Sequence, residues 1–396
     1  MLLALRWSML RIGDQKMDKK ISTVILAAGM SSRMGRPKEL MEIGGKKAIV
    51  RLIESNFKAG ITDIVVVLGH RSKDISKCID DMNVKFVVNE DFMSGMLSSV
   101  QKGVEQLNQN AAGFMIMPAD IPLIKANTIK ELSEFFYQGN FDIAIPCFGE
   151  RRGHPPIISQ KCICKILTGN PAYGMKDILD SEMWSKGTFQ AVDEGILLEM
   201  DTMADYLKLL EYQYNSRVPN FDECREIWRR CGLGEGAIKH QKAVAESALK
   251  MGRKLVQKGV AIDLKLLEAA ALLHSIKKSV KNHPQRAGEF LAQLGYIQVA
   301  EVVAEHMDLY GIEEEKVTVK ELLYLAEKMV KGTEEVGIEA GFRRMLHHPC
   351  EEIRKRAEYR YSDSLRILQK VKKKIFDDQI YCKPWDRETG RIKQGL

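Results

Sequence analysis

Several features that identify a class of protein at once are missing from this sequence. No apolar run approaches the length of about 20 residues that a membrane-spanning helix needs, so we expect no membrane partner. The eight cysteines include no CxxC pair and no convincing secretory signal precedes them, which predicts reduced thiols in a cytoplasmic protein. The net charge of +7 is mild and no nucleic-acid motif accompanies it, so we expect no nucleic-acid partner.

The length of 396 residues exceeds what one ordinary hydrophobic core accommodates, which predicts two domains. We expect an N-terminal extension over residues 1–19, a first domain over 20–210 and a linker at 211–220, where the polar run YNSRVPN lies. A helical domain over 221–380 and a tail over 381–396 follow.

The first domain alternates short apolar runs with amphipathic stretches. This alternation is typical of an α/β fold with a doubly wound, mostly parallel sheet. The expected strands are Thr23–Ala28, Ile64–Gly69, Val84–Asn89, Phe114–Pro118 and Asp142–Phe148. Ligands of such folds bind at the carboxyl ends of the strands. Beyond Tyr206 the strand signals stop and helical periods continue to Phe376, which predicts an all-α second half.

A loop of small residues follows the first expected strand and reads LAAGMSSRMGRPK over residues 26–38. Glycine and serine let backbone N–H groups approach phosphate oxygens, and Arg33 and Lys38 supply positive charge. The stretch matches neither GxGxxG nor a GK[ST] ending, which argues against a dinucleotide fold of the usual kind and against a P-loop.

This stretch resembles the first motif of the molybdenum cofactor nucleotidyltransferases, LA[AG]GxSxRMGxxK. The resemblance covers about 185 residues with five motifs in the family's order. It implies a Rossmann-type fold like that of the nucleotide-diphospho-sugar transferases, with Arg33 and Lys38 as catalytic groups. The nucleotide-binding residues that it implies are Leu26, Ala27, Ala28, Gly29, Ser31, Gly35, Lys38, Asn89, Gly95 and Ser98.

Two acidic residues are candidates for a Mg²⁺ site, because Mg²⁺ prefers one or two carboxylates together with substrate phosphates. Asp120 follows an apolar strand within PADIPL and resembles the family's catalytic metal ligand. Asp201 lies in DTMAD, where Met203 replaces the proline that is usual in the family. A helix N-cap is an equally good interpretation of Asp201.

The sequence RGHP at residues 152–155 resembles an acceptor-side loop of the cytidylyltransferase branch. The resemblance places Arg152, Gly153 and His154 near the acceptor. His154 has two open interpretations, since it could bind the acceptor phosphate or pack in the interior. The serines near Asn89 also have a second interpretation as helix caps.

The helical half resembles the HD phosphohydrolase domain over about residues 237–345. A possible metal site there comprises His240, His274, His283 and His306. Ser275 replaces the aspartate of the HD pair, and Glu327 stands where the last aspartate is usual. Because a neutral hydroxyl neither holds a metal ion well nor bridges two, we expect a non-hydrolytic or regulatory domain.

Together these resemblances imply a Mg²⁺-dependent enzyme that transfers CMP from CTP to the phosphate of a molybdopterin-type cofactor and releases pyrophosphate. A molybdenum hydroxylase would then be the recipient of the product. Two alternatives stay open at the level of the sequence. The acceptor could be another phosphate, such as a sugar or alcohol phosphate, or the chain could be a non-catalytic chaperone of the cofactor.

Overall fold

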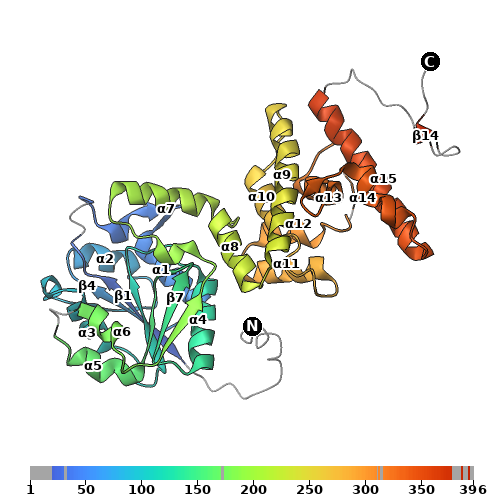
Figure 1. Cartoon of the computed structure of the whole chain (residues 1–396). Helices are drawn as coiled ribbons and strands as arrows, with labels where there is room; N and C mark the ends of the chain where they lie inside the picture. The colour runs from blue at the N-terminus through green and yellow to red at the C-terminus, as the bar shows by residue number, and fades with distance from the viewer. Residues whose placement is uncertain are drawn as a thin grey trace. The chain divides into compact units, whose positions relative to one another are not determined.

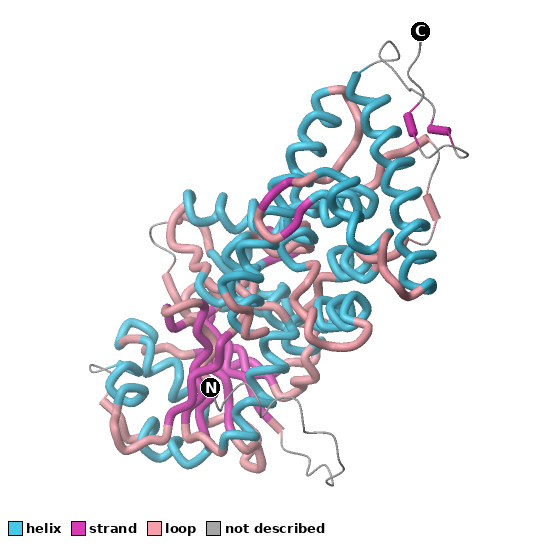
Figure 2. The backbone as a smooth tube through the Cα atoms, turned by 45° about the vertical axis from the view of Figure 1, so that its right-hand side comes forward, coloured by secondary structure: helices cyan, strands magenta, loops and turns pink. Residues whose placement is uncertain are grey.

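The computed structural model describes residues 20–30, 34–170, 174–309, 311–312, 315–376, 385–386 and 391–392. Its contacts divide the chain into one unit that ends at Gly232 and a second that begins at Leu233. Strands gather in the first unit, whereas helices dominate the second (Figure 2). None of the helices in the described part of the chain has the length and hydropathy that a membrane span requires.

The first unit is built on a mostly parallel sheet with the strand order β10-β7-β9-β6-β1-β4-β5, and β8 pairs with β7 (Figure 1). The strands of this sheet are β1 Ile21–Ala27, β4 Ile64–Leu68, β5 Lys85–Val88, β6 Gly113–Pro118, β7 Ile143–Phe148, β8 Arg151–Arg152, β9 Ile157–Ser159 and β10 Lys186–Gln190. The parallel pairs are β1 with β4 and β6, β4 with β5, and β7 with β10. The predicted α/β class is therefore confirmed.

Helices cover both faces of this sheet because β1 is apolar on both sides. Ile25 packs with helices α1 Ala48–Lys58, α2 Ser72–Ile79 and α4 Ala126–Gly139. Its neighbour Val24 packs on the opposite face with α3 Met96–Val104, α5 Ile163–Leu167 and α6 Gly174–Asp180. Consecutive side chains of a strand point to opposite faces, so a strand covered on both sides reads as a continuous apolar run.

Helix α3 packs against the sheet at Gly103 with no room for a side chain. A Cβ atom at this position would overlap the side chains of Val24 and Val67. Glycine therefore sets the distance between α3 and strands β1 and β4, and the N-terminus of α3 is placed against the end of β1.

Strand β9 runs antiparallel between β6 and β7. The sequence did not predict it, nor the edge strands β8 and β10. β9 has only three residues and follows Pro155 and Pro156, and prolines are a poor signal for a strand inside a sheet. β10 alternates exposed and buried residues over five positions, which is a short signal for an edge strand.

The boundary between the units differs from the predicted linker at residues 211–220. Helix α7, Met203–Asn215, extends into that segment, and α8, Phe221–Arg230, falls in the first unit. Arg230 pairs with Glu131 through two bonds of 2.8 Å, and the Lys125 amine lies 2.7 Å from the Glu223 carboxylate. These ion pairs attach α8 to α4 and to the loop before it.

The described residues of the second unit form helices and two short hairpins. Its helices are α9 Glu235–Gln257, α10 Leu264–Leu273, α11 His283–Gln293, α12 Ile297–Ala304, α13 Val319–Met329, α14 Gly337–Leu346 and α15 Glu351–Phe376. The hairpins pair β11 Val330–Lys331 with β12 Glu334–Glu335, and β13 Trp385–Asp386 with β14 Arg391–Ile392. The predicted all-α character of this half is confirmed. A third small hairpin, β2 Glu42–Ile43 with β3 Lys46–Lys47, lies in the first unit.

Candidate functional site

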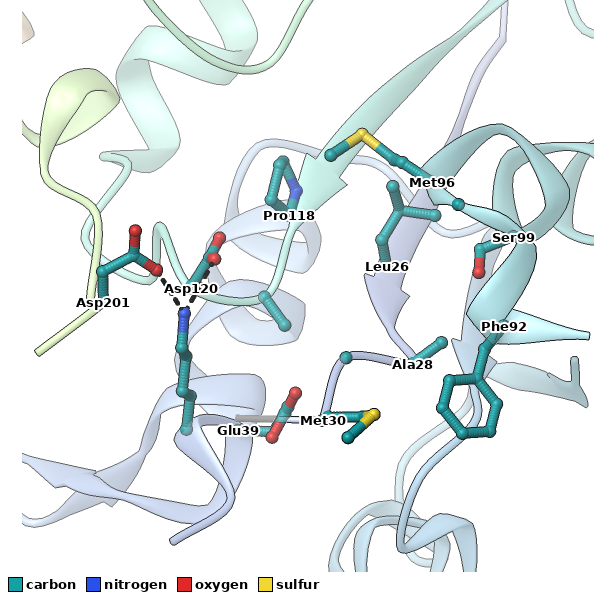
Figure 3. Close-up of a pocket in the computed structure, with 14 residues that line it drawn as sticks. Leu26, Ala28, Met30, Glu39, Phe92, Met96, Ser99, Pro118, Asp120 and Asp201 are labelled. Atoms are coloured by element: carbon teal, nitrogen blue, oxygen red, sulfur yellow. Dashed lines mark hydrogen bonds and ion pairs between the residues drawn. The ribbon is translucent and has the colours of Figure 1, made fainter. Parts of the chain in front are cut away.

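A pocket of about 360 Å³ opens at the carboxyl ends of β1 and β6 (Figure 3). This is the edge of the sheet where ligands bind in doubly wound folds. The residues that line it are Leu26, Ala28, Gly29, Met30, Lys38, Glu39, Phe92, Gly95, Met96, Ser99, Pro118, Ala119, Asp120 and Asp201. They come from segments that are up to 175 residues apart in sequence, from Leu26 to Asp201, so the fold assembles the pocket.

Lys38 links the two predicted carboxylates. It opens the short helix η2, Lys38–Leu40, and its amine lies 2.5 Å from Asp201 Oδ1 and 3.3 Å from Asp120 Oδ2 (Figure 3). Burial lowers the pKa of this amine, but the hydrogen bonds and charges of Asp201 and Asp120 outweigh that effect and raise it above its ordinary value. Lys38 therefore carries a positive charge at neutral pH.

Backbone hydrogen bonds fix Asp120 at this place. The Ala119 amide donates to the Leu26 carbonyl at 3.0 Å, which ties the segment after β6 to the end of β1. The Met200 amide donates to the Asp120 carbonyl at 2.8 Å, which brings the following Asp201 to the same point. The two carboxylates thus converge, although 80 residues separate them in sequence.

Asp201 does not cap helix α7. Thr202 is the N-cap, and it forms a reciprocal capping box with Asp205. The carboxylate of Asp201 is left to face Lys38 and Asp120. Two carboxylates that converge at one point of a pocket are the donor set that Mg²⁺ prefers, so the residues fit such an ion.

Glu199 is an acidic neighbour that sequence reasoning did not select. Burial raises its pKa, and the charges of Asp120 and Asp201 add to that shift. The segment EMD that contains Asp201 was the available signal, but only the fold shows that Glu199 lies near both carboxylates.

The glycine-rich loop borders the pocket from below in the view of Figure 3. Among the described residues, no atom lies within 4 Å of a Cβ atom placed on Gly29, so the pocket leaves room for a ligand against this backbone. Leu26 and Ala28 also line the pocket, as predicted, whereas the Ala27 side chain is buried in the core on one face of the sheet. Gly35 has φ +63° and is not a lining residue. Ser31 and Arg33 lie outside the described residues.

The beginning of α3 forms the opposite end of the pocket from Asp120 and Asp201 (Figure 3). Gly95 and Ser99 line this end, together with the apolar side chains of Phe92 and Met96. Gly95 has φ +110°, a conformation that favours glycine.

Asn89 and Ser98 hold this end of α3 together and are not lining residues. The Asn89 amide donates to Ser98 Oγ at 2.9 Å and to Ser99 Oγ at 3.0 Å, and Asn89 Oδ1 accepts from the Asp91 amide. Ser98 donates to the Gly95 carbonyl at 2.8 Å. These two residues act on the pocket by positioning Gly95 and Ser99.

The predicted acceptor residues lie outside the pocket lining. Arg152 is exposed and pairs with Asp180 at 2.9 Å. Gly153 packs against Ile196, where a Cβ atom would approach within 2.7 Å. His154 is largely buried, and its burial lowers the pKa of the imidazole despite the nearby charge of Asp120. A neutral imidazole close to Asp120 is compatible with both interpretations of His154.

The second unit contains a cluster of imidazoles around one carboxylate. The Nε2 atoms of His240 and His274 lie 3.2 and 3.1 Å from Glu327 Oε2. These three residues are the only group of three or more histidine, cysteine, aspartate or glutamate side chains in the described part of the chain whose ligand atoms converge in this way. Burial opposes ionisation of Glu327, yet the two imidazoles hold its pKa well below the usual value.

The other two predicted histidines flank this cluster. The ring of His306 lies 5.1 Å from that of His274, and the ring of His283 lies 5.3 Å from that of His306. Ser275, next to His274, accepts a hydrogen bond of 3.2 Å from the buried amide of Gln241. Sequence reasoning noticed Glu327 but did not count it among the ligands.

Comparisons with known proteins find similarity to part of this chain. Residues 23–186 match the family described as the MobA-like NTP transferase domain. The bifunctional protein GlmU of Caldicellulosiruptor saccharolyticus is 34% identical over 123 residues, which are 30% of this chain and 26% of that protein. The chain thus spans about a quarter of the length of the curated relatives it matches.

Two solved structures are similar to about half of this chain. A nucleotidyl transferase from Methanothermobacter thermautotroptrophicus is 22% identical, covers 50% of this chain and 99% of its own, and has a TM-score of 0.43. The molybdopterin-guanine dinucleotide biosynthesis protein A of Archaeoglobus fulgidus is 14% identical, covers 49% and 100%, and has a TM-score of 0.39.

Proposed function

We propose that the first unit, of which residues 23–186 match the family described as the MobA-like NTP transferase domain, is a Mg²⁺-dependent nucleotidyltransferase acting on an NTP and a phosphate acceptor. One observation carries the proposal. Lys38, Asp120 and Asp201, from three distant segments, converge at one end of a pocket bordered by a glycine-rich loop. This arrangement suits a reaction between two anions, because neutralisation of their charge is then the largest contribution to lowering the activation barrier.

In this reaction a phosphate oxygen of the acceptor attacks the α-phosphorus of the NTP. A new P–O bond forms, the bond from the α-phosphorus to the bridging oxygen breaks, and pyrophosphate leaves with that electron pair. The Lys38 amine offsets negative charge on the phosphates, and the backbone at Gly29 leaves space for their approach. Asp120 and Asp201 would hold Mg²⁺, which supplies further charge neutralisation when bound.

The apolar end of the pocket suits the base of the nucleotide. Phe92 and Met96 offer contact area there, and the Ser99 hydroxyl offers a hydrogen bond. We propose CTP as the preferred donor, because the Ala28 methyl lies in the lining and narrows the space for a purine. One methyl contributes only about 1–3 kcal/mol of discrimination. Equal kcat/KM values for CTP and GTP would contradict this preference.

The proposed acceptor is the terminal phosphate of a molybdopterin-type cofactor, with a cytoplasmic molybdenum hydroxylase as the recipient. The resemblance of the motifs at residues 26–38, 89–99, 120 and 152–155 to the cytidylyltransferase branch supports this acceptor. Arg152, Gly153 and His154 belong to the proposal as acceptor-side residues.

The test is incubation of the full chain with each NTP, Mg²⁺ and molybdopterin, followed by measurement of pyrophosphate and of the dinucleotide. We expect both products with CTP. If pyrophosphate is released with a sugar phosphate but not with molybdopterin, the sugar phosphate would be the acceptor in place of the proposed cofactor. If the chain binds molybdopterin but releases pyrophosphate from no NTP, the proposal of an enzyme would be refuted in favour of a cofactor chaperone.

For the second unit we propose a non-hydrolytic role. The resemblance to HD domains places Ser275 where hydrolytic members have a metal-bridging aspartate, and its hydroxyl accepts a hydrogen bond from Gln241. The full chain carrying Asp120→Asn, loaded with Mn²⁺ or Co²⁺, should not hydrolyse nucleotides or generic phosphoesters. Metal-dependent hydrolysis that disappears in His274→Ala would refute this role.

A further inference from the structure

The Lys38 amine contacts both carboxylates that the proposed transferase reaction assigns to Mg²⁺. Its nitrogen lies 2.5 Å from Asp201 Oδ1 and 3.3 Å from Asp120 Oδ2 (Figure 3). Only 14% of the Lys38 side chain is exposed, so solvent screens these contacts weakly. In this structure the amine is therefore a cation that balances the charge of the two carboxylates.

A divalent ion would bind to the same oxygens. Because Mg²⁺ holds its oxygen ligands at about 2.1 Å, an ion on Asp201 Oδ1 would lie no farther than about 4.6 Å from the Lys38 nitrogen in its present position. Like charges at that distance repel each other strongly where solvent is partly excluded. The amine and the ion therefore compete for Asp120 and Asp201, and the amine must leave before the ion binds well.

The Lys38 amine has a second position within its reach. Lys38 opens helix η2 and also lines the pocket, as does Gly29 of the glycine-rich loop. The lysine side chain is a flexible four-carbon stem with a compact charge at its end. From the same backbone position, the amine can therefore turn from the two carboxylates to the phosphates of a nucleotide in the pocket.

We propose that the Lys38 amine is an internal competitor of the divalent ion, and that the triphosphate of the nucleotide relieves this competition by binding the amine. This inference rests on the nucleotidyltransferase function proposed above. Asp120 and Asp201 then bind a divalent ion weakly without the nucleotide and tightly with it. Because linkage between two ligands is reciprocal, the ion strengthens binding of the nucleotide by the same factor.

The test measures Mn²⁺ binding to the full chain by equilibrium dialysis, independently of turnover. Mn²⁺ accepts the same oxygen ligands as Mg²⁺ and is counted by electron paramagnetic resonance. Only the binding that Asp120→Asn removes in each background is counted, which excludes ions bound elsewhere. Without nucleotide, Lys38→Gln should bind Mn²⁺ at least about tenfold more tightly than the unmodified chain, because the variant lacks the competing charge.

Lys46→Gln is the matched control. It also removes one positive charge that pairs with a carboxylate, that of Glu54, but Lys46 is exposed and is not a pocket residue. Its affinity for Mn²⁺ should equal that of the unmodified chain. Circular dichroism verifies that each variant is folded, and Lys38→Met, which is equally neutral, replaces Lys38→Gln if the latter is unfolded.

A second arm adds an excess of a CTP analogue in which a methylene group replaces the oxygen between the α- and β-phosphorus, so that no pyrophosphate leaves. At equal free Mn²⁺, Lys38→Gln should lose its advantage in affinity, because the phosphates then hold the amine of the unmodified chain. An advantage that persists with the analogue would overturn the role of the nucleotide.

Equal Mn²⁺ affinities of folded Lys38→Gln and the unmodified chain without nucleotide would overturn the competition itself. Pyrophosphate release by the unmodified chain tests the proposed function separately. A chain that shows the competition without turnover would keep this inference and lose the transferase function. A chain that releases pyrophosphate without the competition would lose only this inference.

Discussion

The substitution Asp120→Asn should abolish most of the transferase activity while the fold survives. Asn keeps the shape of the side chain but removes one unit of charge from the point where Asp120 and Asp201 converge on Lys38. At a separation of about 4 Å and an effective dielectric constant near 20, one pair of unit charges contributes about 4 kcal/mol. Since about 1.4 kcal/mol corresponds to a factor of ten in rate, we expect kcat to fall about a thousandfold.

The cost to stability should be small. The Lys38–Asp120 pair spans 3.3 Å, but a third of the Asp120 side chain is exposed, so solvent screens the interaction. Pairs of this kind contribute about 0–1 kcal/mol to folding. Lys38 also keeps its contact of 2.5 Å with Asp201. The urea midpoint of the variant should therefore stay close to that of the unmodified chain.

The assay is pyrophosphate release at several Mg²⁺ concentrations. We expect the variant to require more Mg²⁺ as well as to turn over slowly. Asp74→Asn is the control, because Asp74 pairs with Arg71 at 2.7 Å on an exposed surface and is not a pocket residue. A rate for folded Asp120→Asn within about tenfold of the unmodified rate would refute the assignment of Asp120 to the metal. Such a rate would mean that the lost charge contributes no more than about 1.4 kcal/mol to the reaction.

Three further predictions concern the first unit. Ser99→Ala should raise KM for the NTP about fivefold in steady-state kinetics, because one hydrogen bond of about 1 kcal/mol is lost. Ser98→Ala should chiefly lower the stability measured by urea unfolding, because Ser98 bonds to the Gly95 carbonyl and does not line the pocket. Thr202→Ala removes the N-cap of α7 and should cost about 1 kcal/mol in urea unfolding. Burial by itself raises the pKa of Asp63. Hydrogen bonds from Ser22, Lys85 and Asn108 lower this pKa by a larger amount, so the pKa lies below its ordinary value of 3.8. The stability that Asp63 contributes is therefore present above pH 3.8 and is lost as the pH falls below it; unfolding from pH 6 to 2 should show this loss, and an equally steep loss in Asp63→Asn would contradict it.

The sequence predicted the sheet well where strands are buried on both faces. β4, β6 and β7 are continuous apolar runs, β1 is apolar from Val24 to Ala27, and each strand lies within two residues of its expected bounds. It failed where structure depends on distant partners. Nothing near Glu223 or Arg230 in sequence shows that their partners are Lys125 and Glu131, so α8 was assigned to the wrong side of the boundary between the units.

The candidate site shows the same division. The positions of Lys38 and Asp120 in the pocket followed from motifs at strand ends, but their role in the reaction is still a prediction. The choice between Ser98 and Ser99 depends on the rotation of α3 about its axis, which two adjacent serines do not reveal. Asn89 was interpreted as a nucleotide ligand, whereas its amide is engaged by both serines.

The contact of Gly103 with β1 connects the pocket to the hydrophobic interior. A larger residue at this position would push α3 away from Val24 and would carry Gly95 and Ser99 with it, because they lie at the beginning of the same helix. Changes of volume among these interior residues are therefore also changes in the width of the pocket. We therefore expect variants of this helix that are selected only for heat resistance to vary in affinity for the proposed nucleotide, even when every residue that lines the pocket is kept.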